Sequence, residues 1–426
     1  MSQPKKKYAV EALGCRTNQY EAQAFRDQLA QMDYEAAAEG EDADLCIVNT
    51  CTVTQHADSH SRHLIRQLMK KHPRAQLVVT GCLAERDPAS IQRLDSSLRI
   101  IPNADKEQLL EKLFPEEDIP EFSIKRFEAH TRAFVKVQDG CNSFCTYCII
   151  PYVRGRSRSR SVDDVVREVR DLVQTGYKEV VLTGINIGDF DGGGAAGCRL
   201  ADLIRAVDKV DGLERLRVSS IDPDEIDAEL QDVILNGKRT CRSMHIVLQA
   251  GSNMILKRMN RKYTRQVFLD TVRTLSNACP DFTVTTDIIV GFPGETEQDF
   301  AETLDVMREV RFAKVHMFPY SDRPRTKAAT YPNKVPSDMI ASRKSRLLRA
   351  AEETALQLRQ QFIGRTMTVL LENREEKGRF FGHTDNFLGV FIEGHTTKLD
   401  TNQLVTVRLV DNQPEGLVGV MHHFPS

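Results

Sequence analysis

The stretch CNSFCTYCIIPYVRGRSRSR, residues 141–160, raises the main question about the fold and chemistry of this chain. It begins with Cys141, Cys145 and Cys148, which are separated by three and then by two residues. It ends with arginines that alternate with small residues, namely Arg154, Arg156, Arg158 and Arg160. The pattern is compatible with a disulfide framework, a zinc knuckle, an iron–sulfur cluster or a disordered arginine–serine tract.

The composition indicates a globular chain with several domains. The sequence has 426 residues, of which 41% are hydrophobic and 28% are charged, and its formal net charge is −2. This length exceeds one ordinary hydrophobic core and predicts two or three domains. The small net charge argues against a uniformly basic surface, so contacts with nucleic acid must come from local patches.

The chain shows no sign of a membrane segment or of secretion. No run approaches the roughly 18 apolar residues that a membrane helix needs. The start, MSQPKKKYAVEALGC, lacks the apolar core of a secretory signal. We therefore expect a cytoplasmic protein without a membrane partner. That setting argues against disulfides for the ten cysteines and favours metal or redox roles.

Three cysteines follow three predicted strands near the N-terminus. Strands are predicted at Tyr8–Leu13, Leu45–Val48 and Leu77–Thr80, and helices at Asn18–Met32 and His63–Lys71. This alternation predicts a parallel sheet covered by helices, a flavodoxin-like domain. The cysteines after these strands are Cys15, Cys51 and Cys82, whereas Cys46 lies inside a strand and is expected in the core. Parallel strands share one carboxyl edge, where these thiols could meet. The alternative is that each is a small buried residue.

A second alternating series follows a charged, proline-containing linker at residues 115–130. Its predicted strands are Phe134–Gln138, Val180–Thr183, Leu216–Ile221, Ile246–Gln249, Thr283–Val290 and Lys314–Phe318. Six strand–helix units are too few for a closed eightfold barrel and predict a partial (β/α)6 barrel.

The pattern of residues changes in the C-terminal part of the chain. A charged helical stretch at Ser337–Phe362 precedes short strands at Thr366–Leu371, Phe387–Glu393 and Leu404–Leu409, which predict a small β-barrel of the oligonucleotide-binding kind. The predicted fold class is α/β, with domains at residues 1–118, 128–360 and 363–426.

The number of cysteines in the central motif favours catalysis over a structural role. Structural zinc takes four ligands, and electron-carrying iron–sulfur clusters take four cysteines, but only three cysteines lie close here. Three thiolates on a four-iron cluster would leave one iron open for a substrate or cofactor. A zinc knuckle completed by a remote residue is the alternative.

The spacing of Cys141, Cys145 and Cys148, with Tyr147 before the last cysteine, resembles the signature of radical S-adenosylmethionine enzymes. The motifs LGCRTNQYE, NTC and TGC ahead of it narrow the resemblance to the methylthiotransferase family, over nearly the whole chain. The resemblance implies a [4Fe-4S] cluster on these three cysteines, whose open iron binds S-adenosylmethionine. One electron from the cluster then cleaves the sulfonium and yields a 5′-deoxyadenosyl radical.

The same resemblance implies a second cluster and further cofactor contacts. A second [4Fe-4S] cluster, held by Cys15, Cys51 and Cys82, would carry or donate the sulfur. The predicted contacts with S-adenosylmethionine are Tyr147, Gly184, Gln249, Gly291 and Gly294. The segment GFPGET, which holds the last two glycines, could instead be a turn that caps a helix. No catalytic residue is expected beyond the cluster cysteines, and Cys198, Cys241 and Cys279 are expected to be structural.

The four arginines form a dense cationic segment suited to a polyanionic backbone. The alternative is a solvated helix start, in which Asp163 and Asp164 pair with them. The segment RGRSRSR resembles the tRNA enzymes of this family that act on N6-threonylcarbamoyladenosine, and the terminal module resembles their TRAM domain.

We therefore expect a methylthiotransferase that modifies C2 of this nucleoside beside the anticodon. The expected partners are a tRNA anticodon stem-loop and an electron donor such as flavodoxin or ferredoxin. Enzymes for isopentenyladenosine or for an aspartate of a ribosomal protein are alternatives within the family. A zinc-stabilised RNA-binding protein without catalysis is the alternative from another class.

Overall fold

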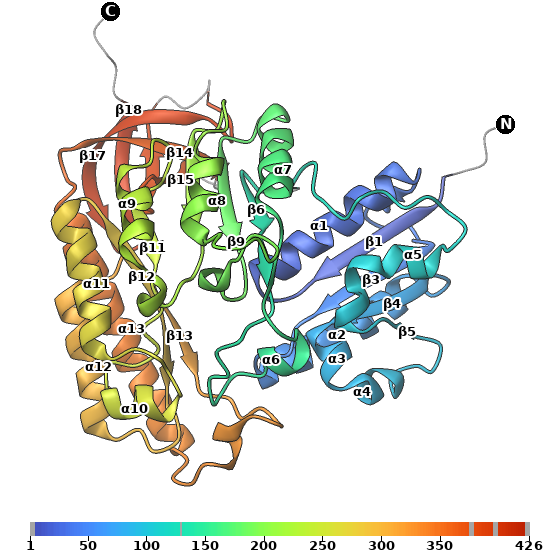
Figure 1. The fold of residues 1–426 in the computed structure, drawn as a ribbon, viewed down its shortest axis with the longest axis horizontal. Coiled ribbons are helices and arrows are strands. Elements are labelled where there is room, and N and C mark those ends of the chain that lie inside the picture. The colour runs from blue at the N-terminus through green and yellow to red at the C-terminus, as the bar shows by residue number, and fades with distance from the viewer. Residues whose placement is uncertain (1–4, 128–129, 375–378, 395–398, 422–426) are drawn as a thin grey trace, which may run out of the picture.

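The computed structural model describes residues 5–127, 130–374, 379–394 and 399–421 (Figure 1). The N-terminal sheet lies on one side of the central barrel, the C-terminal barrel lies at the top of the view in Figure 1 against the central barrel, and α6 lies between the N-terminal sheet and the central barrel. None of the described helices is long and apolar enough to cross a membrane.

The N-terminal part is a five-stranded parallel sheet in the order β2-β1-β3-β4-β5. Its strands are β1 (Lys7–Ala12), β2 (Glu35–Ala36), β3 (Leu45–Thr50), β4 (Gln76–Gly81) and β5 (Arg99–Ile100). Its helices are α1 (Arg16–Gln31), α2 (Gln55–Lys71), α3 (Cys82–Arg86), α4 (Pro88–Gln92), the 3-10 helix η1 (Asn103–Gln108) and α5 (Leu109–Leu113). This is the flavodoxin-like strand order, in which ligands bind where the order reverses, here between β1 and β3.

Strand β3 is buried along its whole length because both of its faces are covered. Leu45 and Ile47 pack into the core that includes residues of α1, while Cys46 and Val48 pack into the core that includes residues of α2. Successive side chains of a strand point to opposite faces, so one apolar run serves two cores. Cys46 is therefore a core residue, as expected.

The central part contains six parallel strands that form a partial barrel, as predicted. They are β6 (Arg132–Lys136), β9 (Glu179–Thr183), β10 (Arg215–Val218), β11 (Ser243–His245), β12 (Thr283–Val290) and β13 (Lys314–Pro319). Two three-stranded sheets, β10-β9-β6 and β11-β12-β13, are joined by the isolated bridges Leu216–Thr240 and Ile221–Ile246. The strand predicted at Ile246–Gln249 is corrected to Ser243–His245. Gln249 has a φ of 63°, so the extended run cannot continue through it.

Helices alternate with the central strands and cover the outside of the barrel (Figure 1). The longer ones are α7 (Val162–Gln174), α8 (Leu200–Val207), α9 (Ala228–Asn236), α11 (Arg265–Ala278) and α12 (Glu297–Val310). The shorter elements are β7 (Gln138–Asp139), α6 (Ile150–Val153), β8 (Arg158–Ser159), η2 (Ile187–Asp189), η3 (Pro223–Glu225), α10 (Asn253–Arg258) and η4 (Lys327–Thr330).

The long helix α13 (Ser337–Gln360) leads into a closed five-stranded barrel in the order β14-β15-β16-β18-β17. Its strands are β14 (Thr366–Arg374), β15 (Phe380–Thr384), β16 (Gly389–Glu393), β17 (Leu404–Gln413) and β18 (Gly416–Met421). This small barrel agrees with the predicted TRAM-like module. Arg215 fixes it to the central part, because its guanidinium donates to the carbonyl oxygens of His383 and Thr368 at 2.9 and 2.6 Å.

Candidate functional site

Cys141, Cys145 and Cys148 lie half-buried in the loop between β7 and α6, at the carboxyl rim of the barrel. The loop is anchored to the end of α10: the N–H of Thr146 donates to the Met259 carbonyl at 3.0 Å. Its start requires a glycine, because Gly140 has a φ of 75° and a Cβ there would lie 2.0 Å from the carbonyl oxygen of Arg156.

The three thiols of this loop lie close enough to affect one another. Burial raises the pKa of Cys148, and the neighbouring thiols Cys145 and Cys141 raise it further. Two N–H groups point at the sulfurs: Arg261 Nη1 lies 3.1 Å from Cys145 Sγ, and the Ser143 amide lies 3.4 Å from Cys141 Sγ. Such donors tune iron–sulfur clusters, and a bound metal deprotonates its thiol ligands. The loop therefore fits a cluster bound through thiolates.

The structure brings Cys15, Cys51 and Cys82 together at the carboxyl edge of the N-terminal sheet. Cys15 caps α1 after β1, Cys51 directly follows β3, and Cys82 is the first residue of α3 after β4. Burial raises the pKa of Cys51 to about 12, and Cys82 and Cys15 act in the same direction. A Cβ on Gly14 would lie 2.8 Å from Cys51 Sγ, so only glycine allows this close approach.

Neither triad has the geometry of a single-ion site. In the part of the chain that the structure describes, no three His, Cys, Asp or Glu side chains are arranged to hold one metal ion. A four-iron cluster takes one thiolate per iron, so its ligands are spaced more widely than those of zinc.

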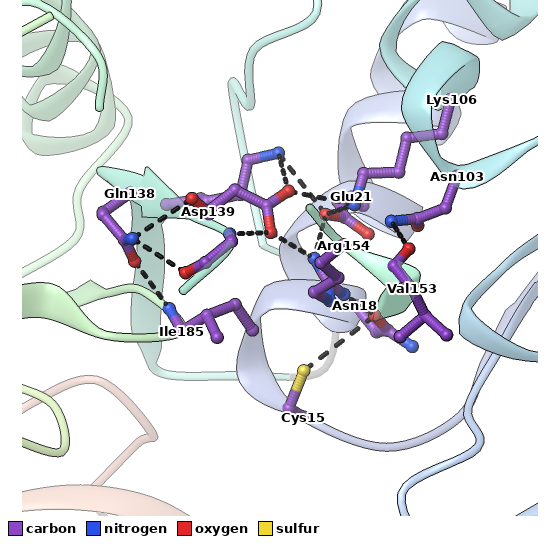
Figure 2. A network of polar contacts seen from close by, with 12 residues as sticks. Cys15, Asn18, Glu21, Asn103, Lys106, Gln138, Asp139, Val153, Arg154 and Ile185 are labelled. Carbon is purple, nitrogen blue, oxygen red and sulfur yellow. Dashed lines mark hydrogen bonds and ion pairs between the residues drawn. The ribbon is translucent and has the colours of Figure 1, made fainter. Parts of the chain in front are cut away.

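A buried network of charges joins α1 and η1 of the N-terminal part to β7 and the end of α6, which flank the central cysteine loop (Figure 2). Lys106 of η1 lies 2.6 Å from Glu21 of α1 and 3.1 Å from Asp139 of β7. Arg154, just after α6, lies 3.2 Å from Glu21 and 2.8 Å from Asp139. Burial alone would raise the pKa of Glu21, but Lys106, Arg154 and Lys136 lower it to about 2. The network therefore stays ionised and fixes the N-terminal sheet against the barrel.

Arg154 also reaches the N-terminal thiols. Its guanidinium donates to Asn18 Oδ1, and the Cys15 thiol lies 3.9 Å from the same oxygen (Figure 2). Burial opposes its charge, but Asp139, Glu21, Cys82 and Cys15 raise the pKa of Arg154. Its Nε is buried and has no partner among the described residues. An unpartnered donor beside three thiols fits a bound group that carries acceptor atoms, such as a sulfide-bearing cluster.

The four arginines of the segment do not form one exposed row. Arg154 is buried, and Arg160 is half-buried in an ion pair with Glu168. Arg156 is exposed, and Arg158 is exposed although it lies 3.3 Å from Asp139. The expectation of an RNA contact is therefore corrected for Arg154, whose charge is used inside the molecule.

A cavity of about 230 Å³ lies between the two parts of the site. Val53 and Thr54 line it from the N-terminal sheet, and Tyr147, Cys148, Gln249, Asp287 and Phe318 are among the residues that line it from the barrel. The Oε1 atom of Gln249 is buried and has no partner among the described residues. This acceptor and the mainly apolar walls fit a cofactor with an adenosyl and an amino acid part.

The three predicted glycines do not line this cavity. A Cβ on Gly184 would meet Gln138 Oε1 at 2.8 Å, and one on Gly291 would meet Ile340 at 2.5 Å. A Cβ on Gly294 would lie 3.0 Å from the guanidinium of Arg258. Each glycine permits close packing at the barrel rim.

Sequence reasoning missed several polar residues of the site. Asn18 and Glu21 carry no signal by themselves, because polar residues on a helix are usually solvated, and Arg261 lies in the loop after α10, where an arginine is usually exposed. The spacing of Cys15, Asn18 and Glu21 was the available clue, since residues three apart share one face of a helix.

The comparisons with known proteins agree with this arrangement. Residues 135–307 match the model of the Radical SAM superfamily, and residues 7–101 match the Uncharacterized protein family UPF0004. A Chlamydia pneumoniae protein named threonylcarbamoyladenosine tRNA methylthiotransferase MtaB is 47% identical, over 97% of this chain and 97% of its own length. The chain belongs to the radical S-adenosylmethionine methylthiotransferase family.

Other members of the family are more distant. A Bacillus subtilis protein with the same name is 36% identical, over 91% of this chain and 90% of its own. A Clostridium perfringens protein named tRNA-2-methylthio-N(6)-dimethylallyladenosine synthase is 33% identical, over 97% of both chains. Membership in the radical S-adenosylmethionine family implies one [4Fe-4S] cluster and S-adenosylmethionine.

The solved structures show the fold. The radical S-adenosylmethionine methyltransferase TsrM of Kitasatospora setae has a TM-score of 0.57 at 14% identity, covering 76% of this chain and 74% of its own. The cobalamin-dependent enzyme OxsB has a TM-score of 0.52 at 13% identity, covering 82% of this chain and 61% of its own.

Proposed function

We propose that this methylthiotransferase acts on tRNA and inserts a methylthio group at C2 of N6-threonylcarbamoyladenosine beside the anticodon. The observation that carries the proposal is a cavity lined by Cys148 of the central triad and by two residues that closely follow Cys51 of the N-terminal triad. Cys148 lines it directly, and Val53 and Thr54 line it just after Cys51. Cys82 packs against Ile149, the residue after Cys148. Groups held by the two triads would face the same space.

In this proposal Cys141, Cys145 and Cys148 hold one [4Fe-4S] cluster, and Cys15, Cys51 and Cys82 hold a second, which provides the sulfur. When bound, the first cluster and S-adenosylmethionine supply the one-electron chemistry that removes a hydrogen atom from an unactivated carbon.

The protein's own residues then have defined tasks. Tyr147 and Gln249 would contact the cofactor, and Gln249 Oε1, which has no partner among the described residues, would accept a hydrogen bond from it. Ile149, Ile150 and Phe318 line the cavity with apolar surface, which keeps water away from a reactive species. Gly184, Gly291 and Gly294 shape the rim behind the cofactor.

The substrate assignment follows the relatives. The protein named for threonylcarbamoyladenosine is 47% identical to this chain, against 33% for the one named for dimethylallyladenosine. We assign the sulfur-donating, radical and RNA-binding units to residues 1–118, 128–360 and 363–426. Arg156 and Arg158, together with the terminal barrel, would contact the anticodon stem-loop. A flavodoxin or ferredoxin would deliver the electron.

Two measurements test this function. Anaerobic reconstitution should yield about eight irons per chain, four for each cluster. In a deletion strain, the methylthio form of N6-threonylcarbamoyladenosine should disappear from tRNA and return with the wild-type gene. Loss of only the isopentenyl form would assign the other tRNA substrate. If all tRNA methylthio groups persisted, a protein substrate would be indicated and the RNA assignment would fail.

A further inference from the structure

A second pocket lies on the other face of the cysteine loop. Its volume is about 310 Å³, at the small end of the range of about 300–1,000 Å³ for ligand pockets. Phe144, Cys145 and Thr146 line it, whereas the next residues, Tyr147 and Cys148, line the cofactor cavity. One loop thus separates two pockets.

Three arginines stack on the aromatic rings of this pocket. The guanidinium of Arg156 lies 4.6 Å from the ring centroid of Phe144, and that of Arg325 lies 5.4 Å from the ring of Tyr152. Tyr331 is covered in the same way by Arg258, at 5.2 Å. Alternating aromatic and guanidinium planes are surfaces on which unpaired bases stack.

The pocket is also positively charged without compensation. Lys257 and Lys327 line it and are exposed, and Arg325 is exposed at its rim. None of the three forms an ion pair with another described residue. The described lining contains no Asp or Glu. Exposed arginines elsewhere do pair, as Arg199 does with Asp227 at 2.7 Å. In a chain of net charge −2, this local excess of cations indicates an anionic ligand.

The walls of the pocket are already held in place. The hydroxyl of Thr146 donates to the Arg258 carbonyl at 2.8 Å, and the amide of Ala328 donates to the Thr146 carbonyl at 2.8 Å. These contacts join the cysteine loop to the end of α10 and to η4. A pocket whose walls are fixed costs little to order when a ligand binds.

We propose that this pocket binds a nucleotide adjacent to the target nucleotide in the unpaired loop of the RNA substrate. Its base would stack beside Tyr152 and Phe144, and its phosphate would lie near Lys257 and Lys327. The target base would enter the cofactor cavity on the other face of the loop, so two successive nucleotides straddle the cysteine loop. This inference rests on the proposed function.

The test measures binding of a synthetic anticodon stem-loop to the reconstituted full-length protein by fluorescence anisotropy at several salt concentrations. Tyr152→Ala should weaken binding about tenfold, while Tyr152→Phe keeps the stacking ring and should bind like the wild type. Lys257→Ala and Lys327→Ala should each reduce the salt slope by about one. Lys209, an exposed residue after α8, provides the control variant Lys209→Ala, which should change neither quantity.

A second arm uses stem-loops with an abasic site on either side of the target. One of these sites should weaken wild-type binding about tenfold and leave Tyr152→Ala with no further loss. If the wild type does not bind the stem-loop, the proposed function itself fails. If it binds and the Tyr152 and lysine variants bind equally well, only the nucleotide pocket is refuted. Variants that bind RNA normally but lose turnover only with an acidic flavodoxin would assign the pocket to an electron carrier and overturn the proposal.

Discussion

Replacing Arg154 tests whether this arginine forms structural ion pairs inside the protein or contacts an RNA substrate. Its guanidinium is buried between Glu21 and Asp139. Arg154→Met leaves both buried carboxylates with one cation fewer. Removing one partner of a buried ion pair costs about 3–5 kcal/mol. Arg156→Met is the matched control, because Arg156 is exposed and forms no ion pair with a described residue. It should change the free energy of unfolding by no more than about 1 kcal/mol, the worth of its exposed contact with the Phe144 ring.

The pH dependence of this loss has a defined sign. The pKa of Glu21 is about 2 in the folded protein, against an ordinary value of 4.5. A lowered carboxyl pKa contributes stability above the unfolded pKa, here about 3 kcal/mol, which is lost as the pH falls toward about 2. Part of that stability comes from Arg154. The difference between wild type and Arg154→Met should therefore be largest near neutral pH and should shrink below pH 4.5.

Urea titration of both variants at neutral and acidic pH measures these differences, with the slope m as a check that the same transition is followed. The double variant Arg154→Met/Glu21→Gln should lose less than the sum of the single variants. It leaves Lys106 with Asp139 at 3.1 Å and Lys136 with Glu107 at 2.7 Å, so charges remain balanced. The reasoning is refuted if Arg154→Met unfolds like the wild type but lowers the salt slope of RNA binding.

Three further predictions concern the clusters and one carboxyl. Cys51→Ala should reduce iron from about eight to about four per chain while reductive cleavage of S-adenosylmethionine persists; loss of both clusters would contradict it. Arg261→Met removes the N–H group that points at Cys145 Sγ. Redox titration followed by EPR should then give a reduction potential for the central cluster that is lower by tens of millivolts. An unchanged potential would show that this contact does not tune the cluster. Burial and then Asp222 raise the pKa of Glu225 to about 7. A raised carboxyl pKa lowers the free energy of unfolding as the pH rises from the pKa of the unfolded chain to about 7. In urea titrations, Glu225→Gln should therefore become more stable than the wild type by up to about 3 kcal/mol at pH 8. A gain in stability at acidic pH instead would contradict this sign.

Helices and strands long enough to repeat their pattern of apolar residues could be predicted from the sequence. Strand β12 was predicted with its observed bounds, and α13 with its observed start. The short strands β2 and β5, of two residues each, carry too few residues for any period. Strands β15 and β18 were missed because glycines interrupt them. Position 382 in β15 requires glycine, because a Cβ there would lie 2.0 Å from the Leu370 carbonyl oxygen of the neighbouring strand β14.

The site was predictable only where the residue type itself carries the signal. Cysteines at strand ends are conspicuous, and the topology then brings them to one edge. The partners of an arginine are not visible in this way: Glu21 lies 133 residues from Arg154 in the chain. Whether a charge faces solvent or a buried carboxylate depends on tertiary packing, which the local pattern does not encode.

The arginine segment shows how one local pattern can divide between two roles. Arg154 ends α6, and Gly155 follows with a φ of 82°, so the chain turns there and the later arginines leave the interior. The buried arginine, Arg154, holds the N-terminal sheet in place against the barrel. Its ion pairs in a low dielectric would break if the N-terminal sheet rotated against the barrel, and breaking them is costly. Two bound groups can react across a cavity only if their separation is held constant. The buried charges that join α1, η1, β7 and α6 supply that constraint, which apolar packing, being non-directional, would supply less strictly.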